Sequence, residues 1–340
     1  MRKTMSFLLL LDACVLLRNA KELKQMESPS VTIMNPKIQS KQQKSSLWRQ
    51  VFRRLLKKKI ALSGLGFLIF IFLFSFIGPF FSPYGISGVD ATNINQPPSS
   101  SHWLGTDKLG RDVLTRLMLA GRISLTVGLG AMIMSLTIGA LLGVLAGYYK
   151  GIIDQIVMRT ADILMTLPGL PLLFIMAAVM SEWEGTSRTA TLPAEQRLYI
   201  VMLMLSLVGW PGLARLVRSQ ILSLREREFI QATDALGLRD RRKLLNHLLP
   251  NTVPLLIVAG TLNVGSAILS ESVLSYFGLG VVPPTASWGN MINAANSLID
   301  FQKRPWLWIP PGVAIFLTVI SINLLGDGLR DAIDPNMKRR

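Results

Sequence analysis

A single acidic side chain lies within the long apolar stretch Thr252–Phe277. This residue, Glu271, has serines close by at positions 270, 272 and 275. A carboxylate in apolar surroundings is costly, so such a residue is by default a candidate functional group. Glu271 could line a pathway and bind the ammonium group of a ligand. Equally, it could accept hydrogen bonds from neighbouring hydroxyls and hold helices together.

Motifs for other chemistry are missing from the sequence. The dipeptide Gly-Lys never occurs, so the chain has no Walker-type loop to hold a nucleotide phosphate. There is no G-x-S-x-G or H-E-x-x-H pattern, Cys14 is the only cysteine, and His102 and His247 lie far apart. The sequence therefore indicates no catalytic residue, no metal site and no cofactor bound by this chain.

The composition predicts the kind of element that positions Glu271. Of the 340 residues, 50% are hydrophobic and 16% are charged, and the mean hydropathy is +0.42. Soluble domains usually have about 25% charged residues. The composition thus disfavours a soluble enzyme, a disordered protein and a coiled coil, and it indicates a membrane protein.

Six apolar stretches are long enough, or nearly so, to cross a bilayer as helices, which takes about 20 residues. We therefore expect an all-α, polytopic membrane protein with six transmembrane helices. Prolines inside these stretches are tolerated where neighbouring helices satisfy the freed backbone groups. The expected spans are residues 60–81, 123–149, 163–180, 198–214, 252–277 and 306–325.

The basic residues predict the orientation. Lys37–Lys59 contains nine Lys or Arg and no acidic residue. With this segment in the cytoplasm, the cytoplasmic segments contain 23 basic residues and the external loops contain eight. This is the positive-inside pattern with both termini cytoplasmic. This distribution of basic residues explains the net charge of +16. The expected partner is therefore the lipid bilayer, and no nucleic-acid partner is expected.

The N-terminal residues 1–46 do not fit the pattern of the rest. Their apolar part, Ser6–Leu17, is too short to span a bilayer, and Asp12 within it disfavours a signal peptide. We expect a poorly ordered extension, or one that is not translated in full if Met26 or Met34 is the true start. The transmembrane domain would then be residues 47–335, followed by a cytoplasmic tail at 336–340.

The polar segment 215–251 is the most informative loop. Residues 225–236 are expected to form a helix that ends at Gly237, because glycine readily takes the left-handed cap conformation. Phe229, Ala232, Thr233 and Leu236 would share one face. A second short helix would run over 240–249 and stop at Pro250. Such a pair could dock into a groove of a partner or lie on anionic lipid.

Specific residues of this loop resemble the "EAA" loop of permease subunits of ABC importers. Gln231, Ala232 and Thr233 stand where E-A-A is expected, Gly237 matches the glycine, and 247–251 matches the Leu-Pro ending. Gln at 231 and Thr at 233 depart from the family pattern. The resemblance implies that the loop couples to an ATPase through Arg227, Glu228, Phe229, Gln231, Ala232, Thr233, Ala235, Leu236 and Gly237.

Further motifs narrow the resemblance to the C-type permease of dipeptide, oligopeptide and nickel importers. They occur in the expected order between Leu47 and Pro335. The matching stretches are 103–114, 121–125, 209–218, 276–280 and 323–335. Several separate motifs in one order are far more specific than any single one.

The resemblance implies a type I ABC importer permease fold in a bacterial inner membrane. It implies four kinds of partner: a second homologous permease subunit, two ATP-binding subunits or domains that bind ATP and Mg, an extracytoplasmic solute-binding protein, and the bilayer. The implied cargo is a short peptide, with nickel or another small solute as the alternative. A self-contained secondary transporter or channel is the alternative of another class, with Glu271 as its only candidate acid in a span.

Two smaller patterns predict structure. Gly139, Gly143 and Gly147 lie on one face of the second span, and small residues at this spacing let membrane helices pack closely. On the external side, Asp107 and Arg111 have the spacing of an i, i+4 ion pair. These two residues, together with Asp112, either hold their loop together or meet a binding protein.

Overall fold

The computed structural model describes residues 47–85, 88–90, 92–186 and 194–333. Contacts divide the chain into two units, Met1–Leu47 and Trp48–Arg340, and the second unit contains the long helices. The expected extension at 1–46 and the expected tail at 336–340 lie outside the described residues.

Within these ranges the chain is helical and contains no β-strand; one isolated bridge pairs Thr106 with Asp112. The α-helices are α3 (Leu47–Leu55), α4 (Lys59–Phe76), α5 (Val113–Tyr149), α6 (Gly151–Thr166), α7 (Gly169–Thr186), α8 (Ala194–Arg225), α9 (Glu228–Ala235), α10 (Asp240–Lys243), α11 (Leu249–Tyr276), α12 (Trp288–Asn293), α13 (Leu298–Lys303) and α14 (Ile309–Ile333). Short helical segments are η1 (Gly78–Phe81), the π-helical η2 (Leu244–Leu248) and η3 (Pro305–Leu307).

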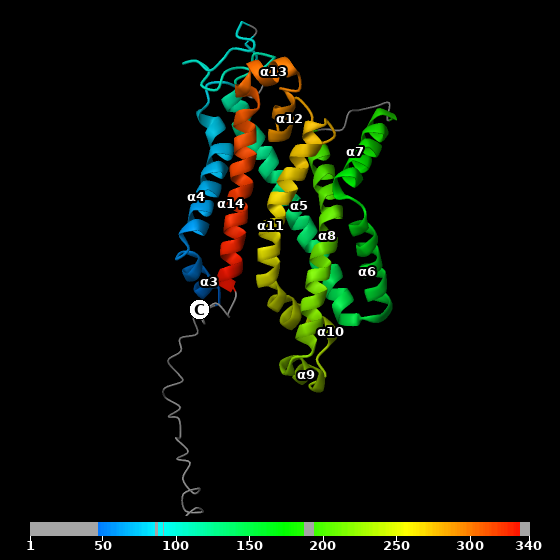
Figure 1. Cartoon of the computed structure of the whole chain (residues 1–340). Coiled ribbons are helices and arrows are strands. Elements are labelled where there is room, and N and C mark those ends of the chain that lie inside the picture. The colour runs from blue at the N-terminus through cyan, green and yellow to red at the C-terminus, as the bar shows by residue number, and fades with distance from the viewer. Residues whose placement is uncertain (1–46, 86–87, 91, 187–193, 334–340) are drawn as a thin grey trace, which may run out of the picture. The chain divides into compact units, whose positions relative to one another are not determined.

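The helix lengths confirm the expected all-α, polytopic membrane fold. Five apolar helical segments among the described residues are long enough to cross a bilayer, and the bent pair α6–α7 makes a sixth if it is counted as one crossing. These segments lie side by side in Figure 1, with α9 and α10 at one end and α12 and α13 at the other.

The span expected at 163–180 differs in its bounds and is broken in the structure. Here α6 and α7 are separate helices that meet at an angle of 94°. Leu167 between them has an extended backbone (φ −81°, ψ 134°), because the ring of Pro168 disfavours the helical conformation of the preceding residue. The third crossing therefore starts at Gly151 and is broken near its middle.

Other helix ends also differ from the expected spans. Helix α5 begins at Val113, ten residues before the expected start, because the Asp112 carboxylate accepts a hydrogen bond from the Thr115 amide at 2.8 Å and caps the helix. Helix α8 continues to Arg225, so the loop does not begin at 215. Pro250 does not stop a helix; it follows the π-helical η2 within the continuous helical run Asp240–Tyr276.

The long helices pack in a fixed order. Helix α5 packs most extensively against α8, α4 lies against α14, and α11 contacts both α5 and α14. The α5–α8 contact contains the three glycines whose spacing predicted close packing. A Cβ atom at Gly139 would lie 2.7 Å from Leu213 Cβ, and one at Gly147 would lie 2.9 Å from Ile221 Cβ. The glycines thus lie at a close contact between two helices of the same chain.

Gly143 makes the closest approach to the α8 backbone, which leads to a stability prediction. A Cβ at this position would lie 2.5 Å from the carbonyl oxygen of Ala214. Gly143→Ala is therefore expected to separate α5 from α8 and to destabilise the chain by about 1–3 kcal/mol. Gly66→Ala is the control, because a Cβ there has no neighbour within 4 Å and alanine favours the helix. Thermal unfolding in detergent should show a lower Tm for Gly143→Ala alone; equal Tm values would contradict the close contact.

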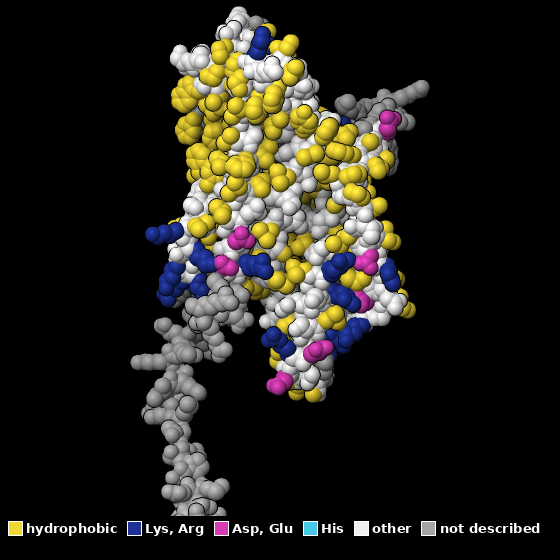
Figure 2. Space-filling model, viewed as in Figure 1, with side chains coloured by type: hydrophobic (Ala, Val, Ile, Leu, Met, Phe, Trp, Pro, Cys, Tyr) yellow, Lys and Arg dark blue, Asp and Glu magenta, His cyan; other side chains and the backbone are white. Residues whose placement is uncertain are grey.

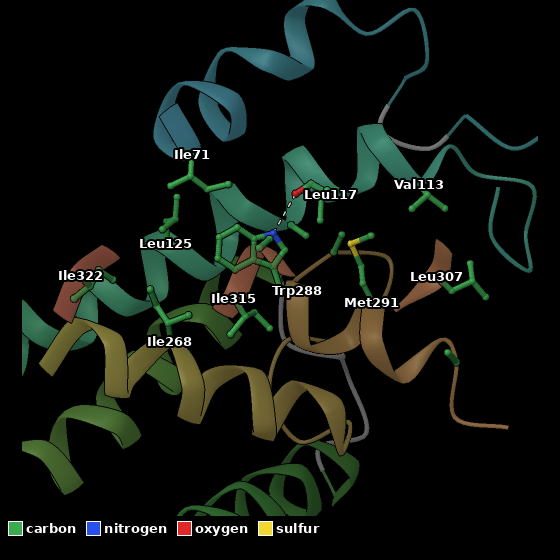
Figure 3. Packing of buried hydrophobic residues seen from close by; sticks show 14 of the residues in the cluster. Ile71, Val113, Leu117, Leu125, Ile268, Trp288, Met291, Leu307, Ile315 and Ile322 are labelled. Atoms are coloured by element: carbon green, nitrogen blue, oxygen red, sulfur yellow. Dashed lines mark hydrogen bonds between the residues drawn. The ribbon is translucent and has the colours of Figure 1, made fainter. Parts of the chain in front are cut away.

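Trp288 of α12 is the centre of the largest buried cluster. Its side chain is fully buried, and its indole Nε1 donates a hydrogen bond to the Leu117 carbonyl at 3.2 Å. Figure 3 shows the surrounding side chains. They come from α4, α5, α11 and α14 and include Ile71, Leu125, Ile268, Ile315 and Ile322. The short α12 thus connects four long helices at the end opposite α9.

Charged side chains are unevenly distributed. On the face shown in Figure 2, hydrophobic side chains cover the length of the long helices, while Lys and Arg gather at the end that carries α3 and α9. This separation of an apolar band from a basic end is typical of a membrane protein.

Candidate functional site

The segment after α8 forms a projecting helical turn at the α9 end. Helix α9 ends at Ala235, and Gly237 just beyond it has a φ of +67°. The Leu238 amide donates to the Thr233 carbonyl at 3.1 Å, which is the 6→1 hydrogen bond of a Schellman motif with glycine at the left-handed position. The chain then reverses direction and enters α10. The helix end predicted from Gly237 is therefore present.

The inner side of α9 is held by apolar packing. Ile230 is 1% exposed and belongs to a cluster with Leu224 of α8, Leu244 and Leu248. Thr233 is also buried, and its hydroxyl donates to the Ile230 carbonyl at 2.7 Å. The α9 segment is therefore packed on α8 and η2.

Polar contacts attach the same segment to α5. The Arg225 guanidinium donates to the Tyr148 carbonyl at 2.6 Å and lies 5.3 Å from the centre of the Tyr148 ring. The Tyr148 hydroxyl donates to the Asp240 carboxylate at 2.6 Å. Through this chain of contacts the end of α8, the start of α10 and the end of α5 are connected.

The outer side of α9 presents the residues that the resemblance selected. Phe229 is 41% exposed and Leu236 is 77% exposed. Eight of the nine expected coupling residues are exposed; they are Arg227, Glu228, Phe229, Gln231, Ala232, Ala235, Leu236 and Gly237. Thr233 is the exception, since it points inward. The expected apolar face of Phe229, Ala232, Thr233 and Leu236 is therefore split, and its exposed part is a small apolar patch.

Beyond Gly237 the chain continues as one helical run into the membrane-length segment. Residues Asp240–Tyr276 form a single candidate span made of α10, η2 and α11. The separate helix expected at 240–249 is thus α10 and η2, which are continuous with α11. This continuity connects the α9 segment directly to the helix that carries Glu271.

Glu271 is fully buried and hydrogen-bonded. Its carboxylate accepts from the Ser275 hydroxyl at 2.6 Å and from the Ser124 hydroxyl of α5 at 2.9 Å. Ser124 in turn accepts from the Trp288 amide at 3.2 Å, and Ser275 accepts from the Val281 amide at 2.9 Å. The carboxylate therefore connects α5 and α11, and through the serines it connects both to the α12 region.

A cavity of about 110 Å³ lies nearby among α5, α7, α8 and α11. Its polar lining residues are Ser135, Asn263, Ser266 and Ser270. Glu271 is not one of its lining residues. The geometry thus favours the hydrogen-bonded role of Glu271 over contact with a ligand.

At the α12 end, two acidic residues organise the loops. Asp107 pairs with Arg111 at 2.8 Å, as the spacing predicted, and also accepts hydrogen bonds from the Leu109 and Arg111 amides.

Asp300 pairs with Lys108 at 2.7 Å and with Arg304. The hydrogen bond from Lys108 is the largest cause that lowers the pKa of Asp300, to about 2, followed by the hydrogen bond from Ser297.

The lowered pKa of Asp300 predicts a pH dependence. Because the folded-state pKa, about 2, lies below the ordinary value of 3.8, the ionised carboxylate stabilises the fold above pH 4 and this contribution is lost as the pH falls through 2. Thermal unfolding of the wild type and Asp300→Asn should show a constant difference in Tm from pH 7 to pH 5, which closes toward pH 2. A difference that disappears between pH 7 and pH 5 would contradict this origin.

Sequence reasoning missed one site residue, Arg116. It lies in α5, one turn after the cap, and its side chain is 10% exposed. It faces Asp107 with an Nε–Oδ2 distance of 3.5 Å. A basic residue at the border of an apolar stretch was the only signal for it, and that signal also fits an ordinary interfacial side chain.

Comparison with protein families gives two matches. The model described as "binding-protein-dependent transport system inner membrane component" matches residues 139–339, which include α8, α9 and Glu271. The model described as "N-terminal TM domain of oligopeptide transport permease C" matches residues 46–98.

Individual relatives are similar along most of the chain. The dipeptide transport system permease protein of Bacillus subtilis is 40% identical over 86% of this chain and 87% of the relative. The oligopeptide transport system permease protein of the same organism is 36% identical over 86% and 91%. The glutathione transport system permease protein of Pectobacterium atrosepticum is 37% identical over 86% and 92%.

Proposed function

The chain belongs to the family of binding-protein-dependent transport system inner membrane components, and from this premise we propose that it forms half of the translocation pathway of an ATP-driven peptide importer. The observation that carries the proposal is the α9 segment, with an exposed apolar outer side and a packed inner side. An exposed helix of this kind suits a groove on an ATPase.

We propose that the α9 end lies in the cytoplasm and that both chain termini lie on that side. The basic side chains at this end support the assignment. ATP and Mg would bind to two partner ATPase subunits or domains. A second homologous permease subunit would complete the pathway, and an extracytoplasmic binding protein would deliver the cargo at the α12 end.

Coupling in this proposal needs no covalent chemistry in the chain. The ATPases bind ATP, close together and displace the α9 segments that lie in their grooves. Because α10, η2 and α11 are one helical run, the displacement reaches the centre of the bundle and changes which side the pathway faces. Energy is transferred only if α9 binds the ATPase differently in the two states.

Short peptides are the proposed cargo. The relatives from Bacillus subtilis and Pectobacterium atrosepticum are named for dipeptide, oligopeptide and glutathione transport, and all three cargoes are peptides or peptide-like molecules. Nickel or another small solute is the alternative cargo for the same machinery.

Co-purification tests the proposal. The tagged protein is extracted in mild detergent, and its partners are identified by mass spectrometry. A second permease subunit together with ATPase subunits is the expected result. A stable, solitary protein that still transports its solute in vesicles would contradict the proposal and favour a secondary transporter.

A substitution at Gly237 tests the coupling role of the turn. Gly237→Val is expected to reduce uptake about tenfold, because a β-branched residue at φ +67° costs about 1–2 kcal/mol and reorients α9. A Cβ atom at this position would have no neighbour within 4 Å, so the expected effect is conformational. ATP hydrolysis by the assembled complex should continue.

Gly237→Asn is the matched control for this substitution. Asparagine is similar in size to valine but tolerates the left-handed conformation. It should therefore preserve uptake. Equal uptake by the two variants in normally assembled complexes would refute the role of the turn.

A further inference from the structure

The Asp107 carboxylate at the α12 end is shared by two arginines. Arg111 holds it closely, with Nε and Nη2 both 2.8 Å from Oδ2. Arg116 faces the same oxygen at 3.5 Å. One carboxylate therefore neutralises two guanidinium groups only in part, and this cluster has a formal charge of +1.

Arg116 is the less satisfied of the two arginines. Nine-tenths of its side chain is buried. The only polar contact of its guanidinium among the described residues is the long one to Asp107, and it donates no hydrogen bond there that meets normal geometry. A guanidinium has five N–H donors, and a buried charge without good partners is costly. The folded chain therefore holds an arginine with donors available for a ligand.

A cavity lies next to these unsatisfied donors. It has a volume of about 150 Å³, and its lining includes Asp107, Arg111 and Arg116 together with Asn290 and Asn293. This is room for a carboxylate group with water molecules around it, since one water needs roughly 10–15 Å³ of such volume. Apolar side chains, Val113, Met291 and Leu307, cover the remaining wall.

The described surroundings contain no spare negative charge that would satisfy Arg116. The other carboxylates of this region already have partners. Asp300 is shared between Lys108 and Arg304, and Asp112 contacts Thr115 and His102. The four basic and two acidic side chains of the two clusters have a formal charge of +2. The amides of Asn290 and Asn293 donate to backbone carbonyls, and so they do not neutralise a cation.

We propose that this cavity is a carboxylate-binding site in which Arg116, assisted by Arg111, binds the ligand. A planar guanidinium binds a carboxylate through paired, charge-assisted hydrogen bonds, and two arginines against one aspartate leave charge for one more anion. The identification of the ligand as the C-terminal carboxylate of an incoming peptide rests on the proposed function; the presence of the site does not.

The test measures binding to the purified full chain in detergent micelles. The probe is N-acetylglycine, which has one carboxylate, and the matched neutral compound is N-acetylglycinamide. Binding is followed by ligand-observed NMR and by the rise in Tm, at constant ionic strength with chloride as the background anion. We expect saturable binding of N-acetylglycine and none of the amide.

Two variants locate the binding. Arg116→Gln should weaken N-acetylglycine binding at least ~10-fold, because the charge and the paired hydrogen bonds are lost. Lys303→Gln is the control; Lys303 is exposed at the same end and does not line the cavity, so affinity should be unchanged. If Arg116→Gln fails to fold, Arg116→Lys keeps the charge but loses the planar fork, and its affinity should still fall.

Several results would overturn the site. They are equal binding of the acid and the amide, the absence of saturable binding in the wild type, and unchanged affinity in a folded Arg116 variant. Each is distinguishable from failure of the proposed function, because the assay uses the isolated chain and does not depend on ATPase co-purification or on uptake.

Discussion

Replacing Leu236 with aspartate is expected to abolish uptake while leaving the chain folded. Leu236 is 77% exposed at the end of α9, so its loss removes little packing within the chain, and the free energy of unfolding should change by no more than about 0.5 kcal/mol. In an ATPase groove the leucine would be buried, which contributes about 1.5–3 kcal/mol, and an aspartate there would be an unpaired buried charge. The amount of co-purified ATPase measures the loss directly.

A leucine-to-aspartate substitution at the α12 end of the helices is the control for Leu236→Asp. Leu298 at the start of α13 is 71% exposed, and Leu298→Asp should retain the ATPase subunits. If Leu236→Asp keeps both the ATPase and normal uptake, the exposed side of α9 is not the coupling surface.

Removing the Glu271 carboxylate is expected to have the largest effect on stability. In Glu271→Leu, the hydroxyls of Ser124 and Ser275 lose their acceptor in a fully buried site. Two buried hydroxyl donors left without an acceptor, at roughly 1.5 kcal/mol each, give a loss of about 3 kcal/mol. The chain should unfold at lower temperature in detergent and accumulate poorly in the membrane.

Glu271→Gln separates the two roles of this residue. The amide keeps one acceptor oxygen, and its NH₂ can donate to a serine oxygen, so most of the stability and the uptake should remain. A Gln variant with unchanged Tm but lost uptake, at both limiting and saturating substrate, would instead place the carboxylate in the pathway.

Local signals explain what could be predicted from the sequence. The composition and long apolar stretches predicted an all-α membrane fold, because crossing a bilayer constrains every helix in the same way. The end of α9 before Gly237 was predictable for a similar reason, since a positive φ favours glycine whatever surrounds it. The Asp107–Arg111 pair depends only on neighbours four residues apart.

Features that depend on distant segments could not be predicted. Pro168 breaks its crossing, whereas Pro211 and Pro254 lie inside continuous helices; packing partners decide between these outcomes. Thr233 is buried whereas Phe229 and Leu236 are exposed, although helical periodicity places all three on one face. The cavity beside Arg116 combines residues of α5 and its preceding loop with residues of α12 and η3, which lie far apart in the sequence.

The contact between α5 and α8 also has a consequence for how the chain is made. The glycine face of α5 is complete about 70 residues before its partner surface on α8 has been synthesised. At 5–20 residues per second this interval is on the order of ten seconds. During that time the glycine face of α5 has no partner from α8. The order of synthesis therefore delays this contact, and a nascent chain stalled before Trp210 lacks the α8 residues that the three glycines meet.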